Sequence, residues 1–206
     1  KDAPLDPTTG QRVNPFASYG TPKKGDFLYK DLNGDGVIDD NDKYAVGHGL
    51  APRLTYGFSL GAEWNGFDFS CLFQGNAGLQ VYWQDKFYMG YINYGDVINK
   101  EIAEGAWREG RTNATYPRLL TGLNTLNAQP SDFWVQNKSY LRLKNVQIGY
   151  KIPKKLLQKL DISQLRLYTS LENMLTFTSY KGIDPEISGT TYPTMKQITV
   201  GVNVVF

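Results

Sequence analysis

Segments of strand length in which apolar and polar side chains alternate constrain the fold of this chain most. Alternation with a period of two puts all the apolar side chains of a strand on one face of a sheet. Five segments follow this pattern, at 53–61, 66–75, 139–152, 164–173 and 196–206. Aromatic residues and glycine, both common in this sequence, add to the β signal. The sequence therefore predicts an all-β fold built from antiparallel strands.

Two local signals refine the predicted strands. Asn65–Gly66 is a two-residue turn signal, so the first two strands should form a tight hairpin. In the third strand, Leu141 and Leu143 have one parity whereas Val146, Ile148 and Tyr150 have the other. A change of parity inside one strand indicates a β-bulge, here near Lys144 and Asn145. Between the strands, 96–107 has helical spacing and predicts one short helix.

The predicted strands are long enough to cross a bilayer at the tilt of a barrel, which takes roughly 9 to 11 residues. A soluble β-sandwich also alternates, so the period alone leaves both open. The connections alternate between short and long, aromatic residues gather near strand ends, and the last strand ends on Phe206. These features are typical of outer-membrane barrels and favour a transmembrane barrel over a sandwich.

Composition argues against several classes of function. The formal net charge is +2 and there is no basic stripe, so no nucleic-acid partner is expected. A single cysteine, Cys71, leaves no internal disulfide, and His48 is the one histidine. We therefore expect no catalytic residues and no enzyme. There is no apolar run of 18 residues and no signal peptide, and the start at Lys1 reads as the middle of a longer protein.

The segment 31–42 (DLNGDGVIDDND) has the spacing of a calcium-binding loop. Such loops supply oxygen ligands from positions 1, 3, 5, 7, 9 and 12, with glycine at position 6. The predicted ligands are Asp31, Asn33, Asp35, the Val37 carbonyl, Asp39 and Asp42. Because no helices flank the loop, we expect a structural calcium ion rather than a sensing switch. The alternative is a turn that holds itself by side-chain to backbone hydrogen bonds.

The segment 81–94 (VYWQDKFYMGYINY) is dense in aromatic side chains that are able to stack on sugar rings or to line a partner surface. The candidate substrate or partner residues are Tyr82, Trp83, Phe87, Tyr88, Tyr91 and Tyr94. The alternative, favoured for most of them, is that they pack a long loop against its neighbours.

Several blocks of the sequence resemble the C-terminal region of SusC/RagA-type TonB-dependent transporters of Bacteroidota. They occur in family order and are 24–47 (KGDFLYKDLNGDGVIDDNDKYAVG), 52–61 (PRLTYGFSLG), 64–75 (WNGFDFSCLFQG), 107–119 (WREGRTNATYPRL), 131–160 (SDFWVQNKSYLRLKNVQIGYKIPKKLLQKL) and 165–187 (LRLYTSLENMLTFTSYKGIDPEI). The block that starts at Trp107 departs from the family, which more often has a Trp-Thr-Pro-Glu-Asn-like run there.

The resemblance implies that the chain supplies the five C-terminal strands of a barrel of about 22 strands around a plug. It places 1–52 outside the cell as a loop with the calcium-type segment, and 53–206 in the C-terminal part of the barrel. Strand parity then makes 76–137 and 176–195 external loops, and 62–66 and 152–163 periplasmic turns. Asp68, Arg166 and Glu172 would face the lumen as an ion-pair lining. Asp184–Glu186 would lie in an external loop, where we interpret them as a hinge or lid contact.

Similar transporters import oligosaccharides or peptides across the outer membrane, together with a SusD-like surface lipoprotein and with energy from TonB. The resemblance thus implies several partners: the remaining barrel and plug, the lipoprotein, the TonB complex reached through an N-terminal part, outer-membrane lipid, and an oligosaccharide or peptide ligand. Two alternatives stay open. One is a secreted, dockerin-like calcium-binding β-sandwich for adhesion or scaffolding, and the other is a passive porin.

Overall fold

The computed structural model describes residues 8, 19–47, 49, 51–82, 91–92, 98–121, 126–158, 161–187 and 192–206. The chain divides into two compact units. One unit comprises residues 1–46 and 82–135, and the other comprises residues 47–81 and 136–206. The sequence predicts a different division, between residues 52 and 53, which separates an external loop from the barrel segment. That division stays a prediction. Among the described residues, no helix is long and apolar enough to span a membrane.

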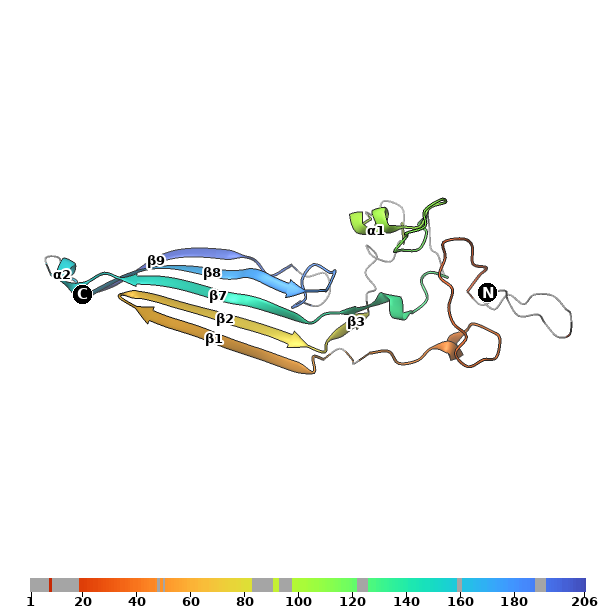
Figure 1. Ribbon diagram of the computed structural model, residues 1–206, viewed down its shortest axis with the longest axis horizontal. Coiled ribbons are helices and arrows are strands. Elements are labelled where there is room, and N and C mark those ends of the chain that lie inside the picture. The colour runs from red at the N-terminus through yellow and green to blue at the C-terminus, as the bar shows by residue number, and fades with distance from the viewer. Residues whose placement is uncertain are drawn as a thin grey trace. The chain divides into compact units, whose positions relative to one another are not determined.

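The second unit is built on a five-stranded antiparallel sheet, in the order β1-β2-β7-β8-β9 (Figure 1). Its strands are β1 (Leu54–Trp64), β2 (Phe67–Ala77), β7 (Tyr140–Lys151), β8 (Gln164–Thr178) and β9 (Gln197–Val205). A short helix, α2 (Lys154–Leu157), connects β7 to β8. All five predicted strands are confirmed, and so is the all-β class.

The turn between β1 and β2 is as tight as the sequence predicts. Trp64 pairs with Phe67, so the loop contains only Asn65 and Gly66. Both loop residues have positive φ angles, 49° and 87°. A pair of left-handed residues gives a turn whose twist matches that of the two strands, and asparagine followed by glycine adopts it most readily.

The predicted bulge lies at Lys144. On one side of β7, Leu72 pairs with Asn145 and Phe73 pairs with Leu143, so Lys144 is an extra residue without a partner on β2. A shift also occurs toward β8, between Leu143 and Asn145. Because one extra residue reverses the alternation, Arg142 and Asn145 lie on the same face although their numbers differ in parity.

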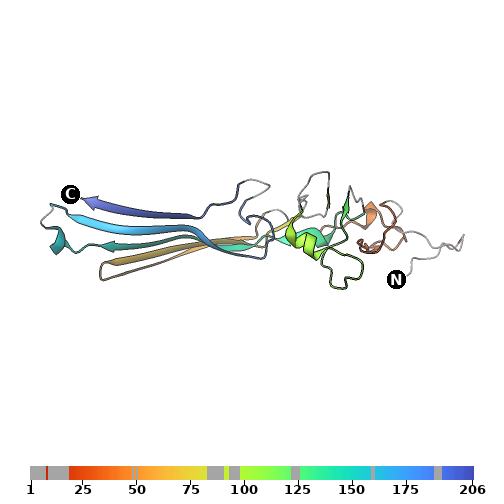
Figure 2. The ribbon, with the colours of Figure 1, turned by 90° about the horizontal axis from the view of Figure 1, so that it is seen from above.

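The sheet has one polar and one apolar face, because paired residues on neighbouring strands point to the same side. The polar face carries Asp68, Gln147 and Arg166. The apolar face is open to the surroundings within the described residues: the exposed fraction is 78% for Trp64 and 77% for Val200. Seen from above, the strands form one layer (Figure 2). A sandwich would cover this face with a second sheet, and no such sheet is present among the described strands.

The first unit is mostly loop with short elements. They are the 3₁₀ helices η1 (Asp40–Asp42) and η2 (Asp132–Trp134), the helix α1 (Lys100–Gly105) and the paired strands β4 (Tyr91–Ile92) and β5 (Leu120–Thr121). Two further short strands, β3 (Gln80–Tyr82) and β6 (Val135–Asn137), pair with each other, and their residues 80–81 and 136–137 belong to the second unit. The helix predicted within 96–107 is confirmed but shorter, because the Asn99 side chain caps its N-terminus by accepting from the Glu101 N–H.

Two small hydrophobic clusters form the core of the first unit. Trp134 and Ile102, each 1% exposed, contact Tyr116, and Phe27, Tyr82 and Leu119 pack around them. Ile38 and Leu126 form the second cluster with Tyr19 and Tyr29. Since Ile38 belongs to the calcium-type segment, its side chain fixes that segment to the core of this unit.

Candidate functional site

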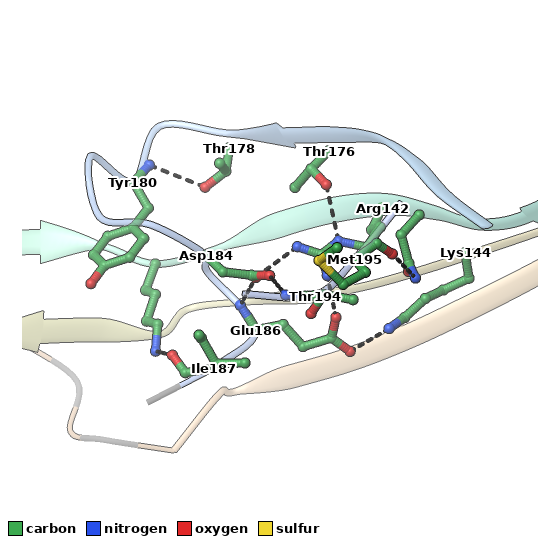
Figure 3. Close-up of polar contacts among 12 residues, drawn as sticks. Arg142, Lys144, Thr176, Thr178, Tyr180, Asp184, Glu186, Ile187, Thr194 and Met195 are labelled. Atoms are coloured by element: carbon green, nitrogen blue, oxygen red, sulfur yellow. Dashed lines mark hydrogen bonds and ion pairs between the residues drawn. The ribbon is translucent and has the colours of Figure 1, made fainter. Parts of the chain in front are cut away.

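A buried ion cluster on the polar face of the sheet joins β7 to the connection between β8 and β9 (Figure 3). Its centre is Arg142 of β7, which is 3% exposed. The guanidinium donates from Nη2 to Asp184 Oδ1 and from Nη1 to Glu186 Oε2, each at 2.6 Å. Its Nε donates to Thr176 Oγ1 of β8 at 2.9 Å. One arginine thus uses its planar fork to contact two acids of the connection and a neighbouring strand.

Asp184 is held by the backbone of its own connection as well as by Arg142. Its Oδ1 accepts from the Glu186 N–H at 2.8 Å, and its Oδ2 accepts from the Thr194 N–H at 3.0 Å. Burial alone would raise the pKa of this carboxyl, but the hydrogen bonds from Glu186, Arg142 and Thr194 outweigh burial and lower the pKa to about 2. Asp184 is therefore ionised throughout the neutral and mildly acidic range.

Two lysines complete the cluster. Lys144, the bulge residue, contacts Glu186 Oε1 at 2.5 Å. Lys138 donates to the Ile187 carbonyl at 2.5 Å, and its ammonium lies 5.6 Å from the centre of the Tyr180 ring. Burial lowers the pKa of Lys138, while the charge of Asp184 opposes that shift. These ion pairs and hydrogen bonds attach the described part of the connection to β7 and β8.

A second ion pair spans three strands of the polar face. Arg166 of β8 donates from Nε to Asp68 Oδ1 of β2 at 2.9 Å and from Nη2 to Gln147 Oε1 at 3.0 Å. β7 lies between β2 and β8, and its residue between the Asp68 and Arg166 side chains is Gly149. A Cβ there would come within 2.6 Å of both charged groups. Of the predicted ion-pair lining of Asp68, Arg166 and Glu172, the pair between Asp68 and Arg166 is present, and it depends on the missing side chain of Gly149. That the three residues face a lumen stays a prediction.

The calcium-type segment folds around its own carboxylates. Asp31 accepts from the N–H groups of Gly34 at 2.6 Å and of Gly36 at 2.8 Å. Asp42 accepts from the N–H groups of Leu32 at 2.7 Å and of Asp39 at 2.9 Å, and these bonds lower its pKa. Within the described ranges, no three His, Cys, Asp or Glu side chains are gathered as metal ligands.

The aromatic candidates fall mostly outside the described residues. Tyr82 lies in β3 and packs against the cluster around Trp134, as the packing alternative predicts for it. Tyr91 begins β4. The other four, Trp83, Phe87, Tyr88 and Tyr94, lie outside the described residues, as does His48. A role of this segment in ligand contact stays a prediction.

One buried polar centre of the first unit was not identified from the sequence. Arg118 donates to both carboxylate oxygens of Asp26 at 2.7 and 2.9 Å, and Asn127 Nδ2 donates to Oδ1 at 3.0 Å. Asn127 Oδ1 in turn accepts from the Phe27 N–H at 2.9 Å. In the sequence, Asp26 is a lone aspartate between Gly25 and Phe27 in a loop. Such a residue does not by itself indicate a partner about a hundred residues away.

The comparisons with known proteins agree with this fold. The chain is 31% identical over 203 residues to TonB-dependent receptor P3 of Formosa agariphila. This match covers 91% of this chain and 20% of the relative. It is 27% identical over 192 residues to TonB-dependent receptor SusC of Bacteroides thetaiotaomicron, covering 87% of this chain and 17% of that receptor. No family model matches the chain.

A solved structure supports the same assignment. The RagAB peptide importer in its open-open state superimposes with a TM-score of 0.66 at 27% identity, covering 87% of this chain and 20% of that chain. The chain thus spans about a fifth of the length of the relatives it matches. Sequence and fold lead to the same family, and this chain belongs to the SusC/RagA-type TonB-dependent receptors as an all-β part of their barrel.

Proposed function

We propose that the chain forms part of the barrel wall of an outer-membrane importer. The observation that carries this proposal is the two-faced sheet, with a broad exposed apolar face and a polar face crossed by ion pairs. An apolar face of this kind suits contact with lipid, and an ion-paired polar face suits the wall of a water-filled path. The matched relatives are named as TonB-dependent receptors, and the matched structure as a peptide importer.

The remainder of the transporter would pair with the two outer strands of the sheet. Within the described part of the chain, β1 and β9 each have one edge without a neighbouring strand. Unpaired backbone groups are not tolerated in hydrocarbon, so these edges require further strands of a closed barrel. The longer protein would supply these strands, the plug and the segment that contacts TonB.

The imported ligand is proposed to be an oligosaccharide or a peptide, delivered with a SusD-like surface lipoprotein. The name of the matched structure, a peptide importer, supports a peptide. The oligosaccharide follows from the resemblance of the sequence blocks to SusC/RagA-type transporters. The loops of the first unit, including 82–94, are the proposed contact region for the ligand and the lipoprotein.

Growth of the source bacterium tests this function. A strain with the complete transporter gene and a strain in which it is deleted are grown on purified polysaccharides in one arm and on a peptide mixture in the other. Deletion should abolish growth on members of one class, and loss of TonB should abolish it equally. Growth that is lost on deletion of the transporter but persists without TonB would instead indicate a passive pore.

Membrane fractionation addresses the soluble alternative. The complete protein should sediment with outer membranes and require detergent for extraction. If it stayed in solution as a monomer without detergent, the secreted sandwich would replace the importer as the better explanation, because an exposed apolar sheet face of this size is not stable in water.

We also propose that residues 31–42 hold a structural calcium ion. The oxygen donors and their spacing suit a hard cation, and Gly36, at the sixth position where such loops turn sharply, adopts a positive φ of 84°. Asp31, Asp35, Asp39 and Asp42 would be the charged ligands, together with Asn33 and the Val37 carbonyl. The anchoring of Ile38 in the core of the first unit makes the proposed role one of shaping the loop.

Calcium removal tests this proposal on the purified transporter. Chelation should increase protease cleavage of the loop between Asp31 and Asp42 and leave the barrel intact. Asp35→Asn should weaken calcium binding by about tenfold or more, because ligand charge sets affinity in such loops. Asp40→Asn is the matched control, since Asp40 bonds to Tyr19 and Lys43 and is off the ligand spacing. Equal behaviour of both variants, or no calcium uptake by calorimetry, would leave the self-bonded turn as the explanation.

A further inference from the structure

We infer that the connection between β8 and β9 is a strap fixed along the polar face of the sheet, and not a lid that opens during transport. The strap comprises the described residues 179–187 and 192–196. The statement that the polar face lines the transport path rests on the proposed function. The statement that the strap is fixed rests on its contacts with Arg142, Lys138 and Asn173.

The outgoing limb of the strap is tied to β7 through Asp184 and Glu186. These acids are separated by Pro185, whose ring restricts the backbone, so both carboxylates are presented to β7 from a stiff segment. Arg142 contacts both of them, and Lys144 contacts Glu186. Lys138 adds a bond to the next carbonyl, that of Ile187. Figure 3 shows Arg142 and Lys144 converging with Asp184 and Glu186 between the strand and the connection.

The return limb is held by hydrogen bonds to the outgoing limb and to β8. Thr194 donates its N–H to Asp184 Oδ2, so the two limbs are joined to each other through one carboxylate. Asn173 of β8 donates from Nδ2 to the Met195 carbonyl at 3.0 Å. Asn173 has a φ of 54°, a left-handed conformation that is rare within a strand and that coincides with the bulge opposite Lys144. The register shift of β7 and β8 therefore lies where the strap is held.

Opening the strap would leave an uncompensated charge. The side chain of Arg142 is 4% exposed and that of Asp184 is 3% exposed. Separating them would leave a guanidinium facing the polar sheet without its two acids, which is far more costly than separating a surface pair. Segments that move in function come from the least stable parts of a fold, whereas this connection has paired charges on its outgoing limb and hydrogen bonds on its return limb. A loop held in this way constrains the space beside the polar face permanently.

Hydrogen exchange on the complete transporter in detergent tests the inference. The reporters are the Glu186 and Thr194 N–H groups, which donate to Asp184. In the unmodified protein they should exchange as slowly as amides of the β7–β8 ladder. Asp184→Asn and Arg142→Met should each accelerate both by about 100-fold or more, because each removes one partner of a buried pair.

A matched variant controls for general damage to the sheet. Asp68→Asn breaks the ion pair with Arg166, elsewhere on the polar face, and should leave both reporter amides slow. If the Arg142→Met protein fails to fold, Arg142→Lys keeps the charge without the fork and should give an intermediate acceleration. Fast exchange of both reporters in the unmodified protein would overturn the strap and indicate a lid. Because exchange is measured without any transported ligand, this result is separate from a failure of the growth test.

Discussion

Replacement of Asp26 with alanine should destabilise the first unit by about 3–5 kcal/mol, the usual cost of removing one partner of a buried ion pair. The Asp26 side chain is 2% exposed and accepts from Arg118 through both oxygens. It also accepts from the Lys23 N–H at 2.8 Å. Without the carboxylate, Arg118 loses the charge that compensates it, and the segment around Phe27 loses its bonds to the Arg118 and Asn127 side-chain donors, keeping the Phe27 N–H bond to Asn127 and the Arg118 N–H bond to Gly25.

Exchange of the Arg118 N–H, which donates to the Gly25 carbonyl at 2.8 Å, reports this loss directly. It should become much faster in the complete transporter with Asp26→Ala, while exchange within the β1–β2 hairpin stays unchanged. Asp40→Ala is the matched control: Asp40 also pairs with a cation, Lys43 at 2.5 Å, but its side chain is 81% exposed. The control should change little, since exposed pairs contribute little to stability. Equal effects of the two substitutions would contradict the role assigned to burial.

The same carboxylate predicts a dependence on pH. Burial alone would raise the pKa of Asp26, but hydrogen bonds from Arg118, from the Lys23 N–H and from Asn127 outweigh it and lower the pKa. A lowered pKa in the folded state means that the stabilisation is complete above the ordinary pKa near 3.8 and is lost as the pH falls through the lowered value. Protease resistance of the first unit should therefore fall at strongly acidic pH, and less so in Asp26→Asn.

The sequence contains enough local information to predict the sheet, and through strand parity the pair of Asp68 with Arg166, but not the clusters around Arg142 and Asp26. Alternation depends on neighbouring residues, and the turn at Asn65–Gly66 and the bulge at Lys144 are visible within a few positions of the chain. Arg142 and Asp184 are 42 residues apart, and Asp26 and Arg118 are 92 apart. Their pairing depends on how a loop returns across a sheet, and many charged side chains at such positions remain in solvent. Gly149 illustrates the difference, because its role appears only when Asp68 and Arg166 are seen to meet above it.

Substitution of Gly75 by alanine should be among the most damaging single changes in the sheet, with a cost of about 3 kcal/mol. Gly75 lies in β2 between Tyr56 of β1 and Leu141 of β7. The Tyr56 ring lies across it, and the Tyr56 hydroxyl donates to the Tyr140 carbonyl at 3.1 Å. A Cβ at Gly75 would approach the Tyr140 carbonyl oxygen far inside contact distance and would lie 2.7 Å from the Tyr56 ring. Glycine is therefore required here for close approach rather than for backbone freedom.

The two obstacles at Gly75 differ in kind, and this difference makes the prediction specific. Tyr56 is a side chain that can rotate away, whereas the Tyr140 carbonyl belongs to the backbone of β7 and moves only if β2 and β7 separate. The double variant Gly75→Ala, Tyr56→Ala should therefore recover little of the urea midpoint that Gly75→Ala loses in the detergent-purified transporter. Gly61→Ala in β1 is the matched control, because its Cβ would lie 3.6 Å from the Phe69 carbonyl, an ordinary contact. Full recovery in the double variant would show that the aromatic ring, and not the approach of β7, excludes a side chain at position 75.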